Sequence, residues 1–353
     1  MKHLASKFSA ALLILVALVA LAVSPAFAWR GSLGWTYDAR YPISSSIAVA
    51  GNIVLAGDNA GYLHAIHMAS GQAAWLYEGF HSVVGLPMVS GQMVVFAQAD
   101  GTITAVSLSN GERIWQHNPQ TGGAAETVME GVAIGDGRVF FARSDGRLLA
   151  LSATNGAVLW TYEADMGLRS APIFSDGFVF LGEFGGRFSA LNPQTGERVW
   201  GGGAGGAINT PATHDGHVFF SSWGGTVHSV QIRGVIPQWN TNVGAPVSTP
   251  PAVGGDRIFV GTANGYIVAL SRANGDILWR FDTEEGTVAG TPIVADGLVF
   301  VASGMGNLFA LDAASGAVRS TFSTEASIIN GSPAFSGGIL FLGSSEARVY
   351  AIR

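Results

Sequence analysis

The residues of this 353-residue chain that could act together chemically are two acids, an arginine, a histidine and two amides. They are Glu126, Glu130, Arg169, His81, Asn209 and Asn330. Carboxylate and amide oxygens can hold a hard cation such as Ca²⁺, and a carboxylate can act as a general base. The same groups can instead bind a ligand or a peptide through charge-assisted hydrogen bonds. These residue types are therefore compatible with either a catalytic site or a binding site.

Glu126 and Glu130 stand out because the corresponding segments elsewhere in the chain carry uncharged residues. The insertion Pro119 to Glu126 makes one interval of a sequence repeat 45 residues long, where the other intervals are 39 to 41. Arg169 lies in the next copy and could neutralise one of the two carboxylates. We expect either a structural ion pair or recognition of a ligand or peptide by these three residues. Most other copies have Ser or Thr before Pro or its equivalent, which indicates hydrogen bonding to the backbone.

Several catalytic chemistries are excluded by what the sequence lacks. It contains no Cys, so disulfides, thiolate catalysis, thiolate metal sites and covalently attached haem are ruled out. It contains neither a Gly-Xaa-Ser-Xaa-Gly nucleophile motif nor a phosphate-binding loop. His214 and His217 have the spacing of two metal ligands, but without a third ligand nearby a surface turn explains them better. We therefore predict no metal site.

The first 28 residues have the pattern of a secretory signal peptide. Lys2 and Lys7 precede an apolar run from Phe8 to Val23 and the triplet Ala26-Phe27-Ala28, after which we expect cleavage. An uncleaved anchor helix is the alternative, but the run is shorter than the roughly 20 apolar residues of a membrane span. We predict an exported protein, periplasmic or extracellular, with no membrane span once residues 1–28 are removed.

The charge of the chain argues against two classes of partner. Acidic residues outnumber Lys and Arg by 24 to 18, and the formal net charge is -6. Nucleic acids and anionic membrane surfaces require a basic patch, and no Lys/Arg cluster is present. We therefore expect neither as the main partner.

A Gly followed by alternating residues that end in Ala-Leu, or an equivalent pair, recurs throughout the chain. The copies begin at Gly61, Gly101, Gly146, Gly186, Gly225, Gly265, Gly306 and, in degenerate form, Ala347. A near-constant period in this range is typical of a repeat architecture. Each period divides into four short alternating segments bounded by Asp-Gly and Asn/Thr-Gly turns, which predicts four strands per repeat.

A Trp ends most copies, and its positions indicate how the chain closes. These Trp residues are Trp35, Trp75, Trp115, Trp160, Trp200, Trp239 and Trp279, with Ser320 in the seventh copy. Trp35 marks an outer strand that lacks three inner strands, whereas residues 332–352 supply three strands without a fourth. We predict an all-β fold, an eight-bladed β-propeller of four-stranded antiparallel blades in one domain (29–353), whose last blade is closed by the N-terminal strand. A linear solenoid would need capping repeats instead.

The phrase Ala-Leu-x4-Gly-x3-Trp occurs at 150–160, 190–200 and 269–279, and less strictly elsewhere. It resembles the tryptophan-docking repeat of the pyrroloquinoline-quinone-like (PQQ-like) propeller superfamily over essentially the whole chain after residue 28. Packing explains the phrase, because a small Ala lets the Trp of the next blade approach and the Gly makes the turn before the outer strand. We expect the seven Trp residues to hold blades together rather than to bind a ligand.

The resemblance implies two possible functions. One is a quinoprotein dehydrogenase, with PQQ beside a Ca²⁺ ion held by carboxylate and amide oxygens and with an Asp as general base. The other is a non-catalytic scaffold for protein–protein interaction, similar to the lipoprotein propeller of the outer-membrane β-barrel assembly machinery, although this chain lacks the Cys that would carry the lipid.

The scaffold is the function that we expect. The chain lacks the adjacent Cys pair of several quinoprotein enzymes, long insertions to cover a cofactor, and a clear Ca²⁺ ligand set. We therefore predict no cofactor and a protein partner that is itself in the cell envelope or secreted. A secreted, self-assembling surface protein is a third alternative.

Overall fold

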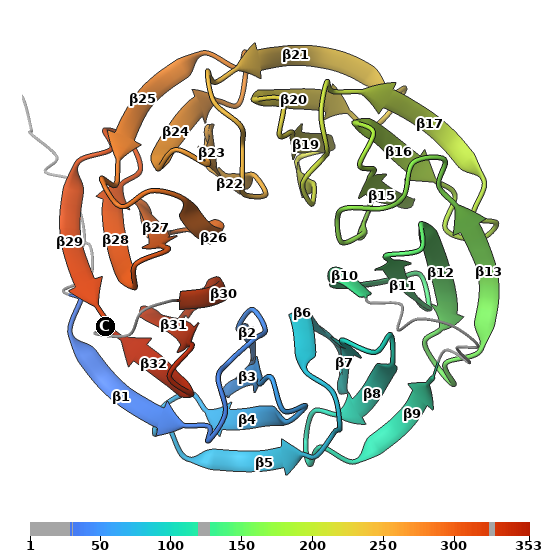
Figure 1. The fold of residues 1–353 in the computed structure, drawn as a ribbon, viewed down its shortest axis with the longest axis vertical. Helices are drawn as coiled ribbons and strands as arrows, with labels where there is room; N and C mark the ends of the chain where they lie inside the picture. The colour runs from blue at the N-terminus through green and yellow to red at the C-terminus, as the bar shows by residue number, and fades with distance from the viewer. Residues whose placement is uncertain (1–28, 30, 119–127, 325–328) are drawn as a thin grey trace, which may run out of the picture.

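The computed structural model describes residues 29, 31–118, 128–324 and 329–353, without the side chains of 128–130, 289, 329 and 330. The predicted signal peptide, residues 1–28, lies outside these ranges. Every helix or strand element within them is a β-strand, and no helix there is long and apolar enough to cross a membrane. The strands form a ring of sheets, and the chain runs once around it (Figure 1).

The described residues form six four-stranded sheets and one eight-stranded sheet. The sheet that joins the two ends of the chain contains β1 (Leu33–Asp38), β30 (Ile329–Ser336), β31 (Ile339–Ser344) and β32 (Arg348–Ile352). The eight-stranded sheet contains β6 (Val83–Ser90), β7 (Met93–Gln98), β8 (Ile103–Ser107), β9 (Arg113–His117), β10 (Val128–Gly135), β11 (Arg138–Arg143), β12 (Arg147–Ser152) and β13 (Val158–Glu163).

The other five sheets are each built from four consecutive strands. They are β2 (Ala48–Ala50), β3 (Ile53–Gly57), β4 (Leu63–His67) and β5 (Ala73–Tyr77); β14 (Ile173–Ser175), β15 (Phe178–Gly182), β16 (Arg187–Leu191) and β17 (Arg198–Gly203); β18 (Ala212–His214), β19 (His217–Ser221), β20 (Thr226–Gln231) and β21 (Ile236–Asn242); β22 (Ala252–Gly254), β23 (Arg257–Gly261), β24 (Tyr266–Ser271) and β25 (Ile277–Asp282); and β26 (Val288–Ala295), β27 (Leu298–Ser303), β28 (Asn307–Asp312) and β29 (Val318–Ser323). The prediction of an all-β, propeller-type fold is confirmed.

The N-terminal strand is paired with the C-terminal strand. β1 runs antiparallel to β32, with Trp35 opposite Ala351 and Asp38 opposite Arg348. The eight-stranded sheet arises because two four-strand groups are linked by a single parallel pairing of Gly131 on β10 with Leu86 on β6. A Cβ on Gly131 would lie 3.2 Å from the backbone nitrogen of Leu86, so glycine permits this close approach.

The innermost strands are shorter or less regular than the sequence predicts. In the fourth copy of the repeat, the segment 168–175 is predicted from the sequence as the inner strand. In the structure β14 begins at Ile173, and Leu168 makes only an isolated bridge to Glu183. A proline directly precedes β14, β18 and β22 and interrupts β6, β26 and β30, and proline has no N–H for the ladder. β2 is equally short and β10 also shifts register, although neither has a proline in or next to the strand. In β6 and β26 the pairing shifts register across Pro87 and Pro292.

The apolar core lies between neighbouring four-strand groups rather than at the centre of the ring. One cluster, for example, joins Phe140 and Leu148 of one group to Val179 and Leu181 of the next. Strands β3, β7, β15 and their counterparts are buried almost throughout. The ring is therefore held together by packing between adjacent sheets.

Tryptophans on the outer strands bind the following group of strands. The indole N–H donates to a backbone carbonyl 33 to 38 residues further along, at 2.8–3.1 Å, in Trp35, Trp75, Trp115, Trp160, Trp239 and Trp279. Each of these rings also contacts a glycine with φ between +72° and +76°, on which a Cβ would lie 2.5–2.7 Å from the ring; these are Gly71, Gly111, Gly156, Gly196, Gly275 and Gly316. The glycine is thus needed both for its backbone angle and for the space it leaves.

This geometry corrects one detail of the sequence analysis. We attributed the approach of a neighbouring Trp to the small Ala of the repeat. In the structure Ala190 lies opposite Trp200 of its own sheet, whereas Gly196 contacts Trp160 of the preceding sheet. The glycine therefore makes the contact between neighbouring sheets that we had assigned to the alanine.

Candidate functional site

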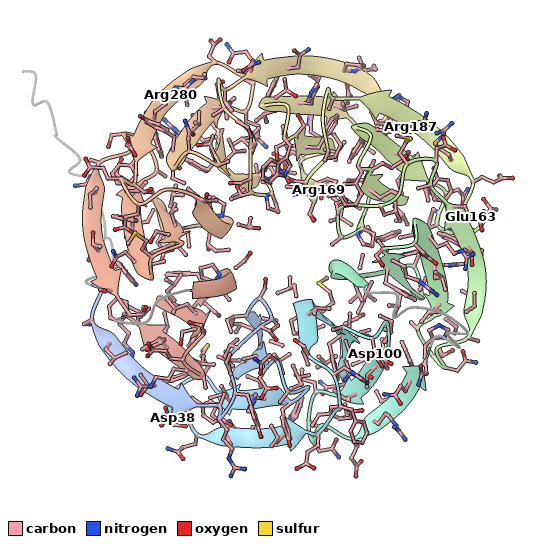
Figure 2. The ribbon with its side chains drawn as sticks, in the orientation of Figure 1. Asp38, Asp100, Glu163, Arg169, Arg187 and Arg280 are labelled. Atoms are coloured by element: carbon pink, nitrogen blue, oxygen red, sulfur yellow. The ribbon has the colours of Figure 1, made fainter. Side chains whose placement is uncertain are left out.

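Arg169 lies in the connection between β13 and β14. The turn between β15 and β16 and the turn between β19 and β20 lie at the same end of their sheets. Its backbone N–H donates to the carbonyl of Gly182 at 3.1 Å, which fixes the connection against β15. Figure 2 shows Arg169 toward the inner side of the ring and Arg187 near its periphery. Arg169 is therefore presented on one face of the ring, close to its centre.

Two exposed aromatic rings flank the Arg169 guanidinium. Its Cζ lies 5.8 Å from the ring centroid of Phe184 and 5.1 Å from that of Trp223, distances at which a cation is attracted to an aromatic face. Phe184 is 49% exposed and Trp223 is 42% exposed. Backbone hydrogen bonds from Phe184 to Gly167 and from Trp223 to Ala207 hold both turns in place.

Arg169 makes no ion pair with any described carboxylate, and its Nε is buried without a hydrogen-bond partner. Beside it, Met166 is 63% exposed and packs next to Gly185. We call Arg169, Phe184, Trp223 and Met166 the arginine–aromatic patch. Exposed Trp and Arg side chains of this kind are enriched at the centres of protein interfaces, and clustered apolar exposure marks interaction sites.

His81 and Asn209, which the sequence also singled out, do not join this patch. His81 lies between β5 and β6, and its Nε2 is 3.5 Å from Asp100 Oδ2. Asn209 is buried, and its amide donates to Ser221 Oγ and to the carbonyls of Val247 and Thr249 at 2.9–3.2 Å. Asn209 therefore joins two successive connections of the ring, and its amide protons are already used.

The acidic residues of the insertion cannot be placed against Arg169. Glu126 lies outside the described residues, whereas Glu130 is in β10 and Asn330 is in β30, in both cases without a described side chain. Their participation in a site stays a prediction.

Ser and Thr residues at the inner connections accept hydrogen bonds from the backbone, as the sequence analysis proposed. Ser170 Oγ accepts the N–H of Gly182 at 2.7 Å, and Thr249 Oγ1 accepts that of Gly261 at 2.8 Å. Thr210 Oγ1 accepts the N–H of Ala171 at 3.1 Å, which links neighbouring connections. These hydroxyls therefore shape the face that carries the arginine–aromatic patch.

A row of buried polar residues escaped the sequence analysis. One polar side chain lies three positions before the first residue of each repeat copy, and all are buried: Asp58, Gln98, Arg143, Glu183, Ser222, Thr262, Ser303 and Ser344. The fixed spacing to the repeat glycine was the available signal. Buried polar groups need hydrogen-bond partners. Because the residue type at this position differs from copy to copy, the repeats differ chemically here.

Glu183 is the member of this row next to the arginine–aromatic patch, since it precedes Phe184. Ser189 Oγ donates to its Oε1 at 3.2 Å, but its Oε2 has no partner. Burial raises the pKa of Glu183 above its ordinary value, a shift that the charge of Arg187 opposes.

Asp58 forms part of a buried hydrogen-bond chain. His64 Nε2 lies 3.0 Å from Asp58 Oδ2, and Tyr37 Oη lies 3.1 Å from His64 Nδ1. Since Tyr37 is on β1 and His64 is on β4, this chain ties the N-terminal strand to the neighbouring sheet. Burial also raises the pKa of Tyr37.

The residues that the structure describes do not fit the calcium site of a quinoprotein. No group of three or more His, Asp or Glu side chains is close enough to hold a metal ion among them. The amide of Asn209 is engaged within the ring. The described donor set therefore gives no support to quinone chemistry.

The ring of antiparallel sheets, its docked tryptophans and the patch on one face define a β-propeller built from PQQ-like repeats. The sequence profile of the family described as outer membrane protein assembly factor BamB matches residues 19–230, 185–319 and 224–353. The chain belongs to this family. The comparison with curated protein sequences gives no match.

Solved structures with the same fold include members of unrelated groups. BamB from Moraxella catarrhalis is 19% identical, with a TM-score of 0.77 over 91% of this chain and 96% of that chain. The computationally designed Ika8 protein is 16% identical, with a TM-score of 0.78 over 92% and 99% of the two chains. Sqt1 from Saccharomyces cerevisiae is 12% identical, with a TM-score of 0.77 over 92% and 99%. At these identities the likeness establishes the fold alone.

Proposed function

We propose that this protein is an exported, non-catalytic scaffold that takes part in the assembly of outer-membrane proteins by binding a protein partner through the arginine–aromatic patch. The observation that carries the proposal is the guanidinium of Arg169 between the exposed rings of Phe184 and Trp223. Membership of the BamB family supports the role in assembly. The signal-peptide pattern of residues 1–28 supports export, to the periplasm or beyond.

The partner segment that fits the patch has an acidic residue beside an apolar one. Arg169 has no carboxylate partner among the described residues, so a carboxylate of the partner can bind its free N–H groups. Phe184, Trp223 and Met166 offer apolar area around that contact. A buried ion pair surrounded by apolar contacts excludes water, which is the usual arrangement at the energetic centre of an interface.

The scaffold that presents the patch is, in this proposal, an eight-bladed propeller in a single domain of residues 29–353. Counting the eight-stranded sheet as two blades supports this number. The pairing of β1 with β32 supports closure of the last blade by the N-terminal strand. A closed ring fixes the connections between blades rigidly, and this favours a preorganised binding face.

The proposal is tested by affinity capture from the native envelope with the wild-type protein and with Arg169→Glu. We expect a component that assembles outer-membrane proteins in the wild-type eluate and its loss with the variant. Arg113→Glu, a charge reversal on the exposed strand β9, is the matched control and should retain the partner. Equal capture by all three proteins would show that the patch is not the binding site.

A further inference from the structure

The outer strand β17 ends in three glycines, and the fold does not explain the last of them, Gly203. None of Gly201, Gly202 and Gly203 has a positive φ, so the backbone does not require glycine there. A Cβ on Gly203 would have no heavy atom within 4 Å. Glycine weakens a strand, and within strands it often marks the close approach of another backbone.

The other outer strands carry a polar or acidic residue at the position of Gly203. Counted three residues after the outer-strand Trp or Ser320, these are Asp38, Glu78, Asn118, Glu163, Asn242, Asp282 and Ser323. Charged side chains on an exposed edge discourage pairing with another chain. β17 alone lacks any side chain at this position, and within the described chain it pairs only with β16.

An open groove runs along the glycines of β17. It has a volume of about 790 Å³, and its walls include Arg187, Arg198 and Trp200. Gly185 and Gly186 also line the groove, and they directly follow Phe184 of the arginine–aromatic patch in the chain. The Trp200 ring lies against Gly202, where a Cβ would be 3.2 Å from Cζ2, so the indole forms part of the groove wall.

A row of buried polar side chains that is complete in the sheet of β6–β9 lacks one member in the sheet of β14–β17. In the sheet of β6–β9, Thr104 Oγ1 donates to Gln98 Oε1 and accepts from Gln116 Nε2, which lies on the outer strand. In the sheet of β14–β17, the corresponding row is Glu183, Ser189 and Gly201. Because Gly201 has no side chain, the row ends at Ser189. The buried Oε2 of Glu183 has no hydrogen-bond partner.

We propose that the outer edge of β17 binds an extended, acidic segment of a partner protein as an additional β-strand. The free backbone of Gly201–Gly203 supplies the pairing edge, which is the mode of recognition known as β-augmentation. Arg198 is exposed and makes no ion pair with a described carboxylate, whereas Arg187 is paired with Asp165. The exposed charge of Arg198, which also acts on the Glu183 carboxylate, favours a segment with Asp or Glu.

This inference does not depend on the proposed function. The arginine–aromatic patch and the glycine edge are formed by different side chains, so variants can remove one and leave the other. Arg169→Glu should leave strand binding at β17 unchanged. Loss of strand binding, conversely, would leave the assignment of the patch intact.

The test is a titration of the purified mature protein with a fluorescein-labelled peptide of alternating Val and Asp, followed by fluorescence anisotropy. The matched probe has Lys in place of Asp. We expect the acidic peptide to bind at least about tenfold more tightly than the basic one. Amide exchange followed by NMR, with ¹⁵N-glycine, should show protection of Gly201–Gly203.

Two variants separate recognition from folding. Gly203→Asp places in open space an acidic residue of the kind that four other outer strands carry at this position, and it should abolish binding. Ser323→Asp on β29 is the control and should not. Arg198→Glu should reverse the preference toward the Lys peptide, which a merely unfolded protein could not do. Equal binding of both peptides, or binding that Gly203→Asp leaves unchanged, would overturn the proposal.

Discussion

Trp29 packs edge-on against Phe300, with 5.0 Å between their ring centroids. Phe300 belongs to β27, in the sheet whose outer strand carries Ser320 where the other outer strands carry Trp. Gly31 stands at the docking-glycine position, and its Cβ would lie 2.6 Å from Ser320 Oγ and 3.2 Å from Trp29 Cζ3. Trp29 therefore supplies from the N-terminus the indole that the seventh repeat lacks.

Trp29→Ala should destabilise the fold, because a buried aromatic side chain between the sheet of β26–β29 and the sheet that joins the two ends of the chain is lost. We expect the free energy of unfolding to fall by about 2–4 kcal/mol in denaturant titrations. Trp223→Ala, which removes an exposed Trp, is the control and should change stability by less than about 1 kcal/mol. If the two variants are equally stable, Trp29 does not substitute for the missing Trp.

Val235 should be a source of strain that a single substitution relieves. It has φ +52° at the position where the other docking turns have Gly, and it packs against the same apolar cluster as Trp200. Trp200 has no indole hydrogen bond within the described residues, and it packs on Phe188 of β16, whereas Trp160, Trp239 and Trp279 pack on a Phe of the second strand. A small apolar cavity lies beside Trp200 and Val235.

Val235→Gly should therefore raise the free energy of unfolding by about 1 kcal/mol, since a β-branched residue in the left-handed region is unfavourable by about 1–2 kcal/mol. The indole N–H of Trp200 should become protected from exchange in NMR spectra. Val199→Gly, at an ordinary strand position, should instead lower stability. A lower free energy of unfolding for Val235→Gly would contradict the claim that Val235 strains the backbone.

Gly196→Ala should be among the most damaging glycine substitutions. A Cβ there would lie 2.6 Å from the Trp160 ring, at φ +74°, so both the contact and the backbone must change. We expect a loss of at least about 2 kcal/mol in thermal or chemical unfolding. Gly203→Ala has open space and should cost less than about 0.5 kcal/mol. Similar losses at both positions would contradict the docking role of Gly196.

Glu183 should make stability fall as pH rises. Because its pKa is raised in the folded protein, the folded state retains its proton over a pH range in which the unfolded state has lost it. The free energy of unfolding therefore decreases from about pH 4, the ordinary pKa of Glu, up to the raised pKa, and stays lower above it.

Glu183→Gln should remove this pH dependence. The variant should melt at a higher temperature than the wild type at pH 7, and the difference should shrink toward pH 4. Scanning calorimetry measures the two melting temperatures. If the difference between the variant and the wild type is the same at every pH, ionisation of Glu183 does not destabilise the folded protein.

The sequence repeat was sufficient to predict four strands per repeat, but it assigned the contact of the neighbouring Trp to the alanine, whereas the glycine makes it. The turns depend on local glycine chemistry, and the alternation of apolar residues fixes which face of each strand is buried. The alternating segment 187–191, for example, is predicted as a strand, and β16 spans Arg187–Leu191. The inner strands were predicted less well, because proline and glycine change the pairing without changing the apolar pattern.

The site was only partly predictable because it depends on contacts between repeats. Arg169 could be singled out from its place before Ser170, but Phe184 and Trp223 lie in turns 15 and 54 residues further along, and only the ring brings them to it. Asn209 has the residue type of a ligand, yet its buried amide serves the backbone. Trp29 could not be recognised, since no repeat precedes it.

Site-specific photo-crosslinking in native cells tests the central claim most directly. A photoreactive phenylalanine analogue at Phe184 should form a discrete crosslink to one envelope protein that assembles outer-membrane proteins, and Arg169→Glu should remove it. The same analogue at Leu159, exposed on the outer strand β13, should form no such crosslink. An equal crosslink from Leu159, or one from Phe184 that persists with Arg169→Glu, would contradict the assignment of the arginine–aromatic patch as the partner-binding site.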